Sequence, residues 1–113
     1  MHELGIALET INLVKEGAAE NNIVHVEEIG LRIGALSGVD PEALRFAIEA
    51  STTDTLMAGV KISIEHVPVR GVCQTCKETI EIEAFLFVCC HCGSVDLEIN
   101  QGDELDIVYI SGH

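Results

Sequence analysis

The sequence contains Cys73-Gln74-Thr75-Cys76 and, after twelve intervening residues, Cys89-Cys90-His91-Cys92, and these two motifs are the main clue to how the chain folds. Two Cys-x-x-Cys pairs at such a short separation can bring four thiolates to one tetrahedral cation, and Zn²⁺ is the commonest cation held in this way. We therefore predict a structural zinc site with the ligands Cys73, Cys76, Cys89 and Cys92. Two other interpretations remain: a pair of disulfides, which would suit a secreted protein, or a redox-active dithiol, for which one such motif would suffice.

The second pair contains three cysteines in four residues, so its register has to be chosen. Only Cys89 and Cys92 are separated by two residues, and Gly93 suits the tight turn that follows them. Cys90 is then a spare thiol. His91 remains an alternative ligand, although its position inside the pair turns it outward.

The chain has 113 residues, which is enough for one domain with a modest core. A segment of about 25 residues around the cysteines cannot bury enough apolar surface to be stable alone. Zinc must supply its folding energy, and apparent binding at a structural site is worth roughly 10–16 kcal/mol at neutral pH. We expect this zinc module to span residues 70–99, with residues 1–69 and 100–113 forming the body.

Charge limits the partners of the chain. Nineteen Asp and Glu stand against six Lys and Arg, which gives a formal net charge of −13. Zinc ribbons often bind nucleic acid, but a phosphate backbone is bound by Lys and Arg, so we expect no nucleic-acid partner. There is no run of eighteen apolar residues and no secretory leader, so we expect no membrane contact and a reducing, cytoplasmic location.

Hydrophobic periodicity predicts two helices and three strands outside the zinc module. Residues 4–20 and a segment capped by Asp40 have helical spacing, whereas alternation indicates strands within residues 26–35 and 60–67 and from Leu105. The predicted buried stripes of the helices are Leu4, Ala7, Leu8, Ile11, Val14 and Ala18, and Leu44, Ala47, Ile48 and Ser51, reinforced by Phe46. The predicted fold class is α+β: a small mixed three-stranded sheet with two helices, plus an inserted zinc-ribbon-like module.

The zinc module has its own alternating segments. Residues 80–82 and 85–87 alternate as the two arms of a hairpin would. A further alternation around Leu97 and a turn at residues 101–103 follow. If the last strand returns to the sheet of the body, the zinc module is an insertion between paired strands.

The opening residues Met1-His2-Glu3 give a second candidate metal site. His2 is too large for removal of Met1, so the α-amine, the backbone nitrogen of His2 and its imidazole can form one short chelate. Glu3 can add its amide nitrogen or its carboxylate. Such nitrogen-rich coordination suits Ni²⁺ or Cu²⁺ more than zinc. The alternative is that His2 and Glu3 merely open the first helix, where an acidic residue interacts favourably with the helix dipole.

Four motifs occur in order along the chain: Met1-His2-Glu3-Leu4, Ile33-Gly34-Ala35-Leu36-Ser37, Pro41-Glu42-Ala43-Leu44-Arg45-Phe46, and the cysteine pairs ending in Cys92-Gly93-Ser94. Together they resemble the hydrogenase nickel-insertion accessory proteins of the HypA/HybF family, from end to end of the chain. One departure is Cys90, where the family often has proline.

The resemblance implies a metallochaperone that delivers Ni²⁺ during assembly of [NiFe]-hydrogenase, and in some bacteria of urease. It implies the GTPase HypB and the hydrogenase large subunit precursor as partners. It also implies that His2 is the nickel ligand, assisted by the Met1 amine and Glu3, and that the four paired cysteines hold zinc.

Several residues have competing interpretations. Asp40 is fully explained as a helix cap, although its carboxylate could complete a nickel site. His25 and His113 form no spacing with other ligands, and we expect both to be solvated. The chain has no Walker-type phosphate loop and no catalytic constellation, so we expect a protein that is not an enzyme. The alternative to a metallochaperone is a zinc-ribbon adaptor that binds a protein and holds no second metal.

Overall fold

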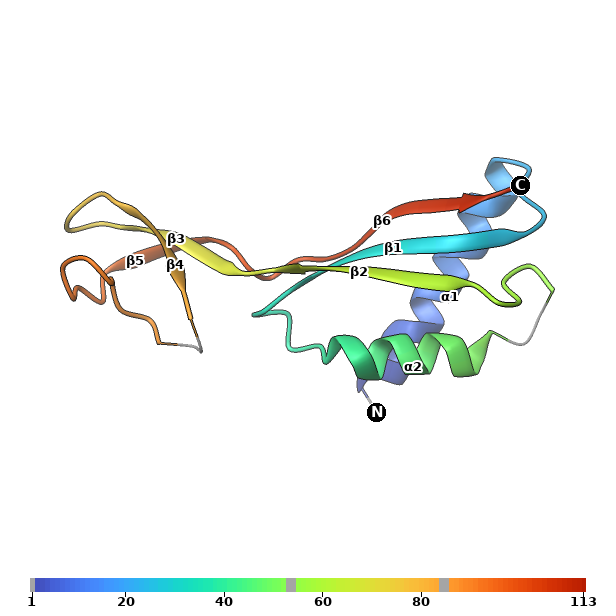
Figure 1. Cartoon of the computed structure of the whole chain (residues 1–113), viewed down its shortest axis with the longest axis horizontal. Coiled ribbons are helices and arrows are strands. Elements are labelled where there is room, and N and C mark those ends of the chain that lie inside the picture. The colour runs from blue at the N-terminus through green and yellow to red at the C-terminus, as the bar shows by residue number, and fades with distance from the viewer. Residues whose placement is uncertain (1, 53–54, 84–85) are drawn as a thin grey trace. The chain divides into compact units, whose positions relative to one another are not determined.

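The computed structural model describes residues 2–52, 55–83 and 86–113 of the chain. These residues form two helices and six strands (Figure 1). The helices are α1 (His2–Glu20) and α2 (Pro41–Ser51); the strands are β1 (Val26–Gly34), β2 (Lys61–Val67), β3 (Val69–Cys73), β4 (Thr79–Ile82), β5 (Leu97–Gln101) and β6 (Leu105–Gly112). One sheet has the strand order β2-β1-β6 and the other β4-β3-β5. The predicted α+β fold is confirmed.

The chain divides into two compact units. The helical unit comprises Met1–Arg32, Val39–Glu65 and Asp106–His113. The cysteine unit comprises Ile33–Gly38 and His66–Leu105. Each unit therefore combines segments that are far apart in the sequence.

The sheet that carries the helices is mixed. His25, just before β1, and His113, just after β6, exchange both backbone hydrogen bonds, at 2.9 and 3.0 Å, as directly opposed residues of antiparallel strands do. β1 and β2 run in the same direction (Figure 1). α2 lies between them in the sequence and forms the crossover connection that parallel neighbours need. The last strand thus returns to the sheet after the cysteine segment, as the sequence predicts.

The two helices bury the faces that their periodicity predicts, with exceptions at the margins. α1 buries Ala7, Thr10, Ile11, Val14 and Ala18, and α2 buries Leu44, Ala47 and Ile48. Leu4 and Leu8 are exposed, because they lie at the edge of the buried stripe. The prediction that Phe46 reinforces the α2 stripe is wrong: its side chain is 73% exposed, since two residues along a helix from Leu44 lead to the opposite face.

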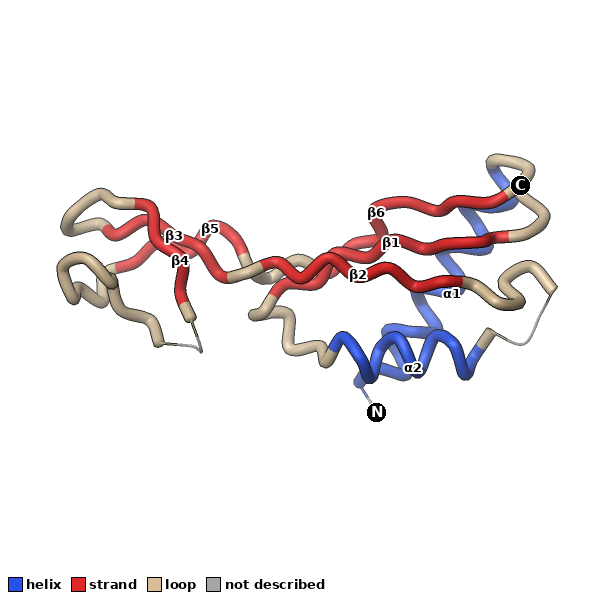
Figure 2. The backbone as a smooth tube through the Cα atoms, viewed as in Figure 1, coloured by secondary structure: helices blue, strands red, loops and turns tan. Residues whose placement is uncertain are grey.

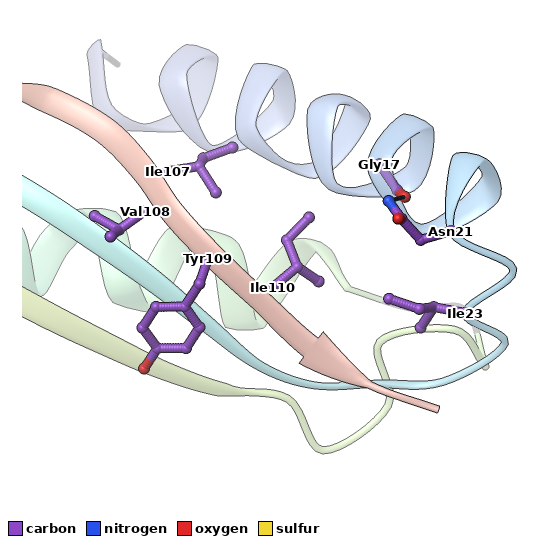
Figure 3. Close-up of a pocket in the computed structure, with 7 residues that line it drawn as sticks. All are labelled: Gly17, Asn21, Ile23, Ile107, Val108, Tyr109 and Ile110. Atoms are coloured by element: carbon purple, nitrogen blue, oxygen red, sulfur yellow. Dashed lines mark hydrogen bonds between the residues drawn. The ribbon is translucent and has the colours of Figure 1, made fainter.

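β6 separates its side chains between the two faces of the sheet. Ile107 and Ile110 point toward α1, whereas Tyr109 points to the other face (Figure 3). A groove of about 430 Å³ runs along this strand, and its lining consists of Gly17, Asn21, Ile23 and residues 107–110. The ring of Tyr109 covers Gly30 on β1, where an added Cβ would overlap the ring.

β3 is the central strand of the second sheet. It pairs antiparallel with β4 and with β5, so that Val69 lies opposite Ile82 and Cys73 opposite Leu97. Gly71 allows this arrangement, because a Cβ there would collide with the carbonyl oxygen of Glu98 on β5. The small core of the unit contains Val69, Cys73, Ile80, Ile82 and Cys89, with Leu36, Cys76 and Leu97 packed against it.

The hairpin predicted within the zinc module is only partly correct. Residues 80–82 belong to a strand, but their partner is β3. Residues 86–96 are loop, tan in Figure 2, so Phe87 is in no strand. Phe85 lies outside the described residues. β3 takes the place of the second arm, with Val72 opposite Thr79 and Gly71 opposite Ile80. In the part of the chain that the structure describes, no helix is long and apolar enough to cross a membrane.

Candidate metal centres

The two Cys-x-x-Cys segments fold into turns of the same kind. The amide of Lys77 donates to the carbonyl of Cys73 at 2.8 Å, and the amide of Gly93 donates to the carbonyl of Cys89 at 2.9 Å. Each donor is the residue after the second cysteine of its pair, and each has a positive φ, 66° at Lys77 and 75° at Gly93. Glycine adopts this conformation without steric cost, so Gly93 suits its position.

These turns point backbone amides at sulfur. The amide of Cys76 donates to Sγ of Cys73 at 3.5 Å, and the amide of His91 donates to Sγ of Cys89 at 3.4 Å. A hydroxyl contact of 2.8 Å between Thr75 and Ser94 joins the two turns. Sγ of the first cysteine in each pair therefore accepts a backbone hydrogen bond, which stabilises a thiolate there. The contact between Thr75 and Ser94 holds the two turns together.

The four sulfur atoms converge. Sγ of Cys73 lies 3.5 Å from Sγ of Cys92, and Sγ of Cys76 lies 3.7 Å from Sγ of Cys89. All four lie within 4.8 Å of one another, and all five cysteines of the chain are free of disulfides. Four sulfurs bound to one Zn²⁺ at about 2.3 Å would be about 3.8 Å apart, so the spacing fits a tetrahedral ion.

Two of the four thiols ionise readily. The amide of Cys76 lowers the pKa of Cys73 to about 6, although burial opposes this shift. The amide of Cys92 likewise lowers the pKa of Cys89. These are the first cysteines of the two pairs, and in both the backbone amides favour the thiolate form that a metal ion requires.

The other two thiols resist ionisation. For Cys76, the amide of Glu78 lowers the pKa, but burial and the neighbouring sulfurs outweigh it and raise the value to about 12. For Cys92, the amide of Ser94 also lowers the pKa, but the sulfur of Cys73 and burial raise it overall. Four negative sulfurs at this distance require a cation between them, so the cluster fits a structural metal ion.

Residues inside the second pair lie outside this cluster. Cys90 is exposed, and His91, whose side chain is also exposed, contributes a backbone amide to the cluster. Among the described residues, the group of converging sulfur ligands contains neither of them.

The predicted N-terminal site lies at the first turn of α1. Nδ1 of His2 is 3.8 Å from the carboxylate of Glu3, and the His2 side chain is 58% exposed. The same carboxylate accepts a hydrogen bond of 3.4 Å from the backbone amide of Asp40. Asp40 is the N-cap of α2, where its side chain accepts from the amides of Glu42 at 3.1 Å and Ala43 at 3.3 Å, as predicted. Met1 lies outside the described residues.

A third group of potential ligands was not expected from the sequence. His25, Glu27 and His113 offer ligand atoms that all lie within 4.8 Å of one another. His113 is exposed, as expected, and His25 is partly buried. Their proximity was not expected, and it arises because antiparallel backbone pairing places them opposite each other. Once β6 is known to pair with β1, the register of that pairing predicts their proximity; their spacing in the sequence does not.

An α+β chain with a converging four-cysteine cluster and exposed nitrogen and carboxylate ligands at a helix start is a small metal-binding protein of two units. Comparison with known proteins identifies the class further. The sequence model of the family described as "Hydrogenase/urease nickel incorporation, metallochaperone, hypA" matches residues 1–112. The chain belongs to this HypA family, whose members are non-catalytic nickel metallochaperones for hydrogenase and urease maturation.

Relatives match over nearly their whole length. The hydrogenase maturation factor HypA of Chloroflexus aggregans is 39% identical over 109 residues, which is 96% of each chain. The hydrogenase maturation factor HybF of Morganella morganii is 32% identical over 112 residues, which is 99% of each chain.

Solved structures support the fold. A solution structure of a HypA protein is 25% identical, with a TM-score of 0.70 over 100% of this chain and 97% of that chain. The solution structure of the nickel metallochaperone HypA from Helicobacter pylori is 24% identical, with a TM-score of 0.65 over 97% of this chain and 96% of that chain. The second likeness concerns the fold alone.

Proposed function

We propose that this chain binds Ni²⁺ at its N-terminus through the imidazole of His2, the α-amine of Met1 and Glu3, and delivers the ion during maturation of [NiFe]-hydrogenase or of urease. The observation that carries the proposal is the position of Glu3. Its carboxylate is held by the amide of Asp40 at 3.4 Å and lies 3.8 Å from Nδ1 of His2. A carboxylate and an imidazole are thereby held next to the chain terminus, whose amine completes a nitrogen-rich ligand set.

Exposure suits a site that must release its ion. The His2 side chain is 58% exposed, so a cation held there can reach the ligands of another protein. An amine and an imidazole bind metal only when they are deprotonated. Protons from solution therefore compete with the ion for these ligands, and the ion can leave. An ion inside the four-sulfur cluster is held by four thiolates, two of which, Cys73 and Cys89, are buried, so it should exchange more slowly.

In this proposal the ion held by Cys73, Cys76, Cys89 and Cys92 is Zn²⁺, and its role is structural. Sulfur spacings of 3.5 and 3.7 Å support zinc, because structural zinc sites with four thiolates are almost always tetrahedral. Residues 70–99 would act as the zinc module, and residues 1–69 and 100–113 as the nickel-binding body.

The partners follow from the same proposal. A nickel metallochaperone of this family would work in the cytoplasm with the GTPase HypB and pass nickel to the hydrogenase large subunit precursor. The chain itself has no phosphate-binding loop of the Walker type, so nucleotide hydrolysis belongs to the partner.

The test is equilibrium dialysis of the untagged, zinc-loaded chain against Ni²⁺. We expect one nickel ion that depends on the N-terminus and is lost in His2→Ala, while zinc stays bound. Residues added before Met1 should have the same effect, because they remove the free amine. His66→Ala is the matched control, since His66 is exposed and distant in sequence from the opening residues.

Undiminished nickel binding after both changes would refute the N-terminal site. Binding of HypB by a chain that takes up no nickel at its N-terminus would instead favour a zinc-ribbon adaptor.

A further inference from the structure

We propose a second, exchangeable site for a divalent transition metal in the helical unit, formed by His25, Glu27 and His113. The three residues lie where β1 begins and β6 ends. They are separate from the ligands of the nickel site proposed above: α1, which starts at His2, is 19 residues and therefore about 28 Å long, and His25 follows its far end.

Backbone pairing fixes the position of this group. His25 and His113 exchange both of their backbone hydrogen bonds, and the carbonyl of His113 also accepts from the amide of Val24 at 2.7 Å. Directly opposed residues of an antiparallel pair present their side chains on the same face. Glu27 is two residues beyond His25 on the same strand, so it shares that face as well.

The side chains converge on that face. Nδ1 of His113 lies 2.7 Å from a carboxylate oxygen of Glu27. The two imidazole rings have a centroid distance of 5.6 Å and are inclined by 48°, so they are not stacked face to face. One ligand atom from each of the three residues lies within 4.8 Å of the other two. Two imidazoles and one carboxylate at this spacing are a ligand set for zinc, nickel, cobalt or copper.

The orientation of His25 leaves one ring nitrogen available to a metal ion. Its Nε2 lies 3.0 Å from the carbonyl oxygen of Ala58. A carbonyl can only accept, so Nε2 carries the hydrogen and Nδ1 presents a free lone pair. A hydrogen bond from one ring nitrogen to a backbone carbonyl is the usual way in which proteins orient a metal-binding histidine.

The contact between His113 and Glu27 is one that a bound cation can replace. The 2.7 Å contact holds a hydrogen between Nδ1 of His113 and Glu27. A divalent ion that binds both groups displaces this hydrogen, which moves to Nε2 of His113 or is released to solvent. Both side chains are well exposed, at 71% and 57%, so the ion can enter from solution. An exposed ion pair contributes little to stability, so a cation can replace the contact between His113 and Glu27 at little cost to the fold.

Metal titration of a variant that lacks the N-terminal site tests the proposal. The His2→Ala chain is first saturated with zinc at the cysteines and then titrated with Zn²⁺ or Ni²⁺ by isothermal titration calorimetry. We expect one further ion per chain, bound more weakly than the cysteine-bound ion. His25→Ala and His113→Ala should each reduce its affinity at least about tenfold. His66→Ala, which removes an exposed histidine outside the group, should leave it unchanged.

Nuclear magnetic resonance of the same zinc-saturated chain gives a readout that needs no substitution in the group. Added Zn²⁺ should shift, and Ni²⁺ should broaden, the ring signals of His25 and His113 before those of His66 and His91. The proposal is overturned if no further ion binds, or if the ring signals of His25 and His113 do not respond. A response that persists at full affinity in His25→Ala would also overturn it. Because His2 is absent in these titrations, their result does not depend on the N-terminal nickel site.

Discussion

Tyr109 organises the exposed face of the sheet in the helical unit. Its ring lies over Gly30, and its hydroxyl donates a hydrogen bond to the carboxylate of Glu28. That bond raises the pKa of Tyr109, because ionisation of the phenol would place two negative charges in contact; a hydrogen bond with Ser63 opposes the shift. The Tyr109 side chain thus covers Gly30 and connects β6 to β1 and β2.

The pH dependence of stability should show this bond. A tyrosine with a raised pKa contributes stability that is fully present below its unfolded value of about 10 and is lost as pH rises through the higher folded value. Tyr109 is the single tyrosine and the chain has no tryptophan, so absorbance at 295 nm follows this residue alone. We expect its titration midpoint to lie above that of the urea-unfolded chain.

Glu28→Gln is the matched variant for this titration. It retains the shape of the side chain but removes the charge, so the midpoint of Tyr109 should move down. A midpoint that is equal in the folded chain, the unfolded chain and the variant would show that the hydrogen bond has no energetic role.

Glycines at two positions should respond oppositely to alanine. At Gly30 an added Cβ overlaps the ring of Tyr109, so Gly30→Ala should lower the free energy of unfolding by about 1–3 kcal/mol. At Gly5 in α1 nothing lies within 4 Å of an added Cβ, so Gly5→Ala should raise it by about 0.5–1 kcal/mol. Urea unfolding followed by circular dichroism at 222 nm measures both. Equal effects at the two sites would contradict the proposed role of the Tyr109 ring.

At the scale of whole elements, the start of α2 combines a cap with a contact to α1. Asp40 accepts hydrogen bonds from the amides of Glu42 and Ala43, and its own amide donates to Glu3. The cap therefore has two roles: it satisfies the first turn of α2, and it fixes a carboxylate of α1.

Substitution of Asp40 separates these roles from metal binding. Asp40→Ala should cost about 1 kcal/mol in the free energy of unfolding, because two helix amides lose their acceptor, whereas Asp40→Asn should cost much less. Chemical denaturation measures the difference. If Asp40→Asn instead retained stability but weakened nickel binding in dialysis, the carboxylate of Asp40 would belong to the nickel site and would be more than a cap.

Helices, caps and cysteine pairs are encoded by residues close together in the sequence and could be predicted from it. Strand pairings depend on residues far apart in the sequence and could not. The stripe containing Ile11 and Val14, the cap at Asp40 and the two cysteine pairs are local patterns, and the structure contains them. The central role of β3 could not be predicted, because it depends on Gly71 and on its partner Ile99, which lies 28 residues further along the chain (99 − 71). The proximity of His25 and His113 was missed for the same reason.

At the scale of the molecule, the two units depend on metal to different degrees. The core of the cysteine unit contains five buried residues, and two of them are the thiols Cys73 and Cys89. The helical unit has an apolar core that includes Ile29, Leu44 and Ile48, which are fully buried. Loss of the metal should therefore affect the cysteine unit first.

Chelation tests this difference. After removal of the metal under reducing conditions, we expect the amide signals of β3, β4 and β5 to lose dispersion, while the ellipticity of α1 and α2 at 222 nm is largely retained. Cys76→Ser should reproduce the effect, because it removes one of the converging sulfurs. Cys90→Ser is the matched control and should leave the metal content unchanged. Loss of all helical signal on chelation would show that the units do not fold separately.

β1 lies between β2 and β6, and the whole cysteine segment comes between those two outer strands in the chain. The edge of β1 that pairs with β6 therefore stays open until the residues that follow the thiols are present. A chain cut short before Leu105 would leave that edge unpaired even with a complete sulfur cage, and an unpaired strand edge is a site of aggregation, so such a truncation should lower solubility.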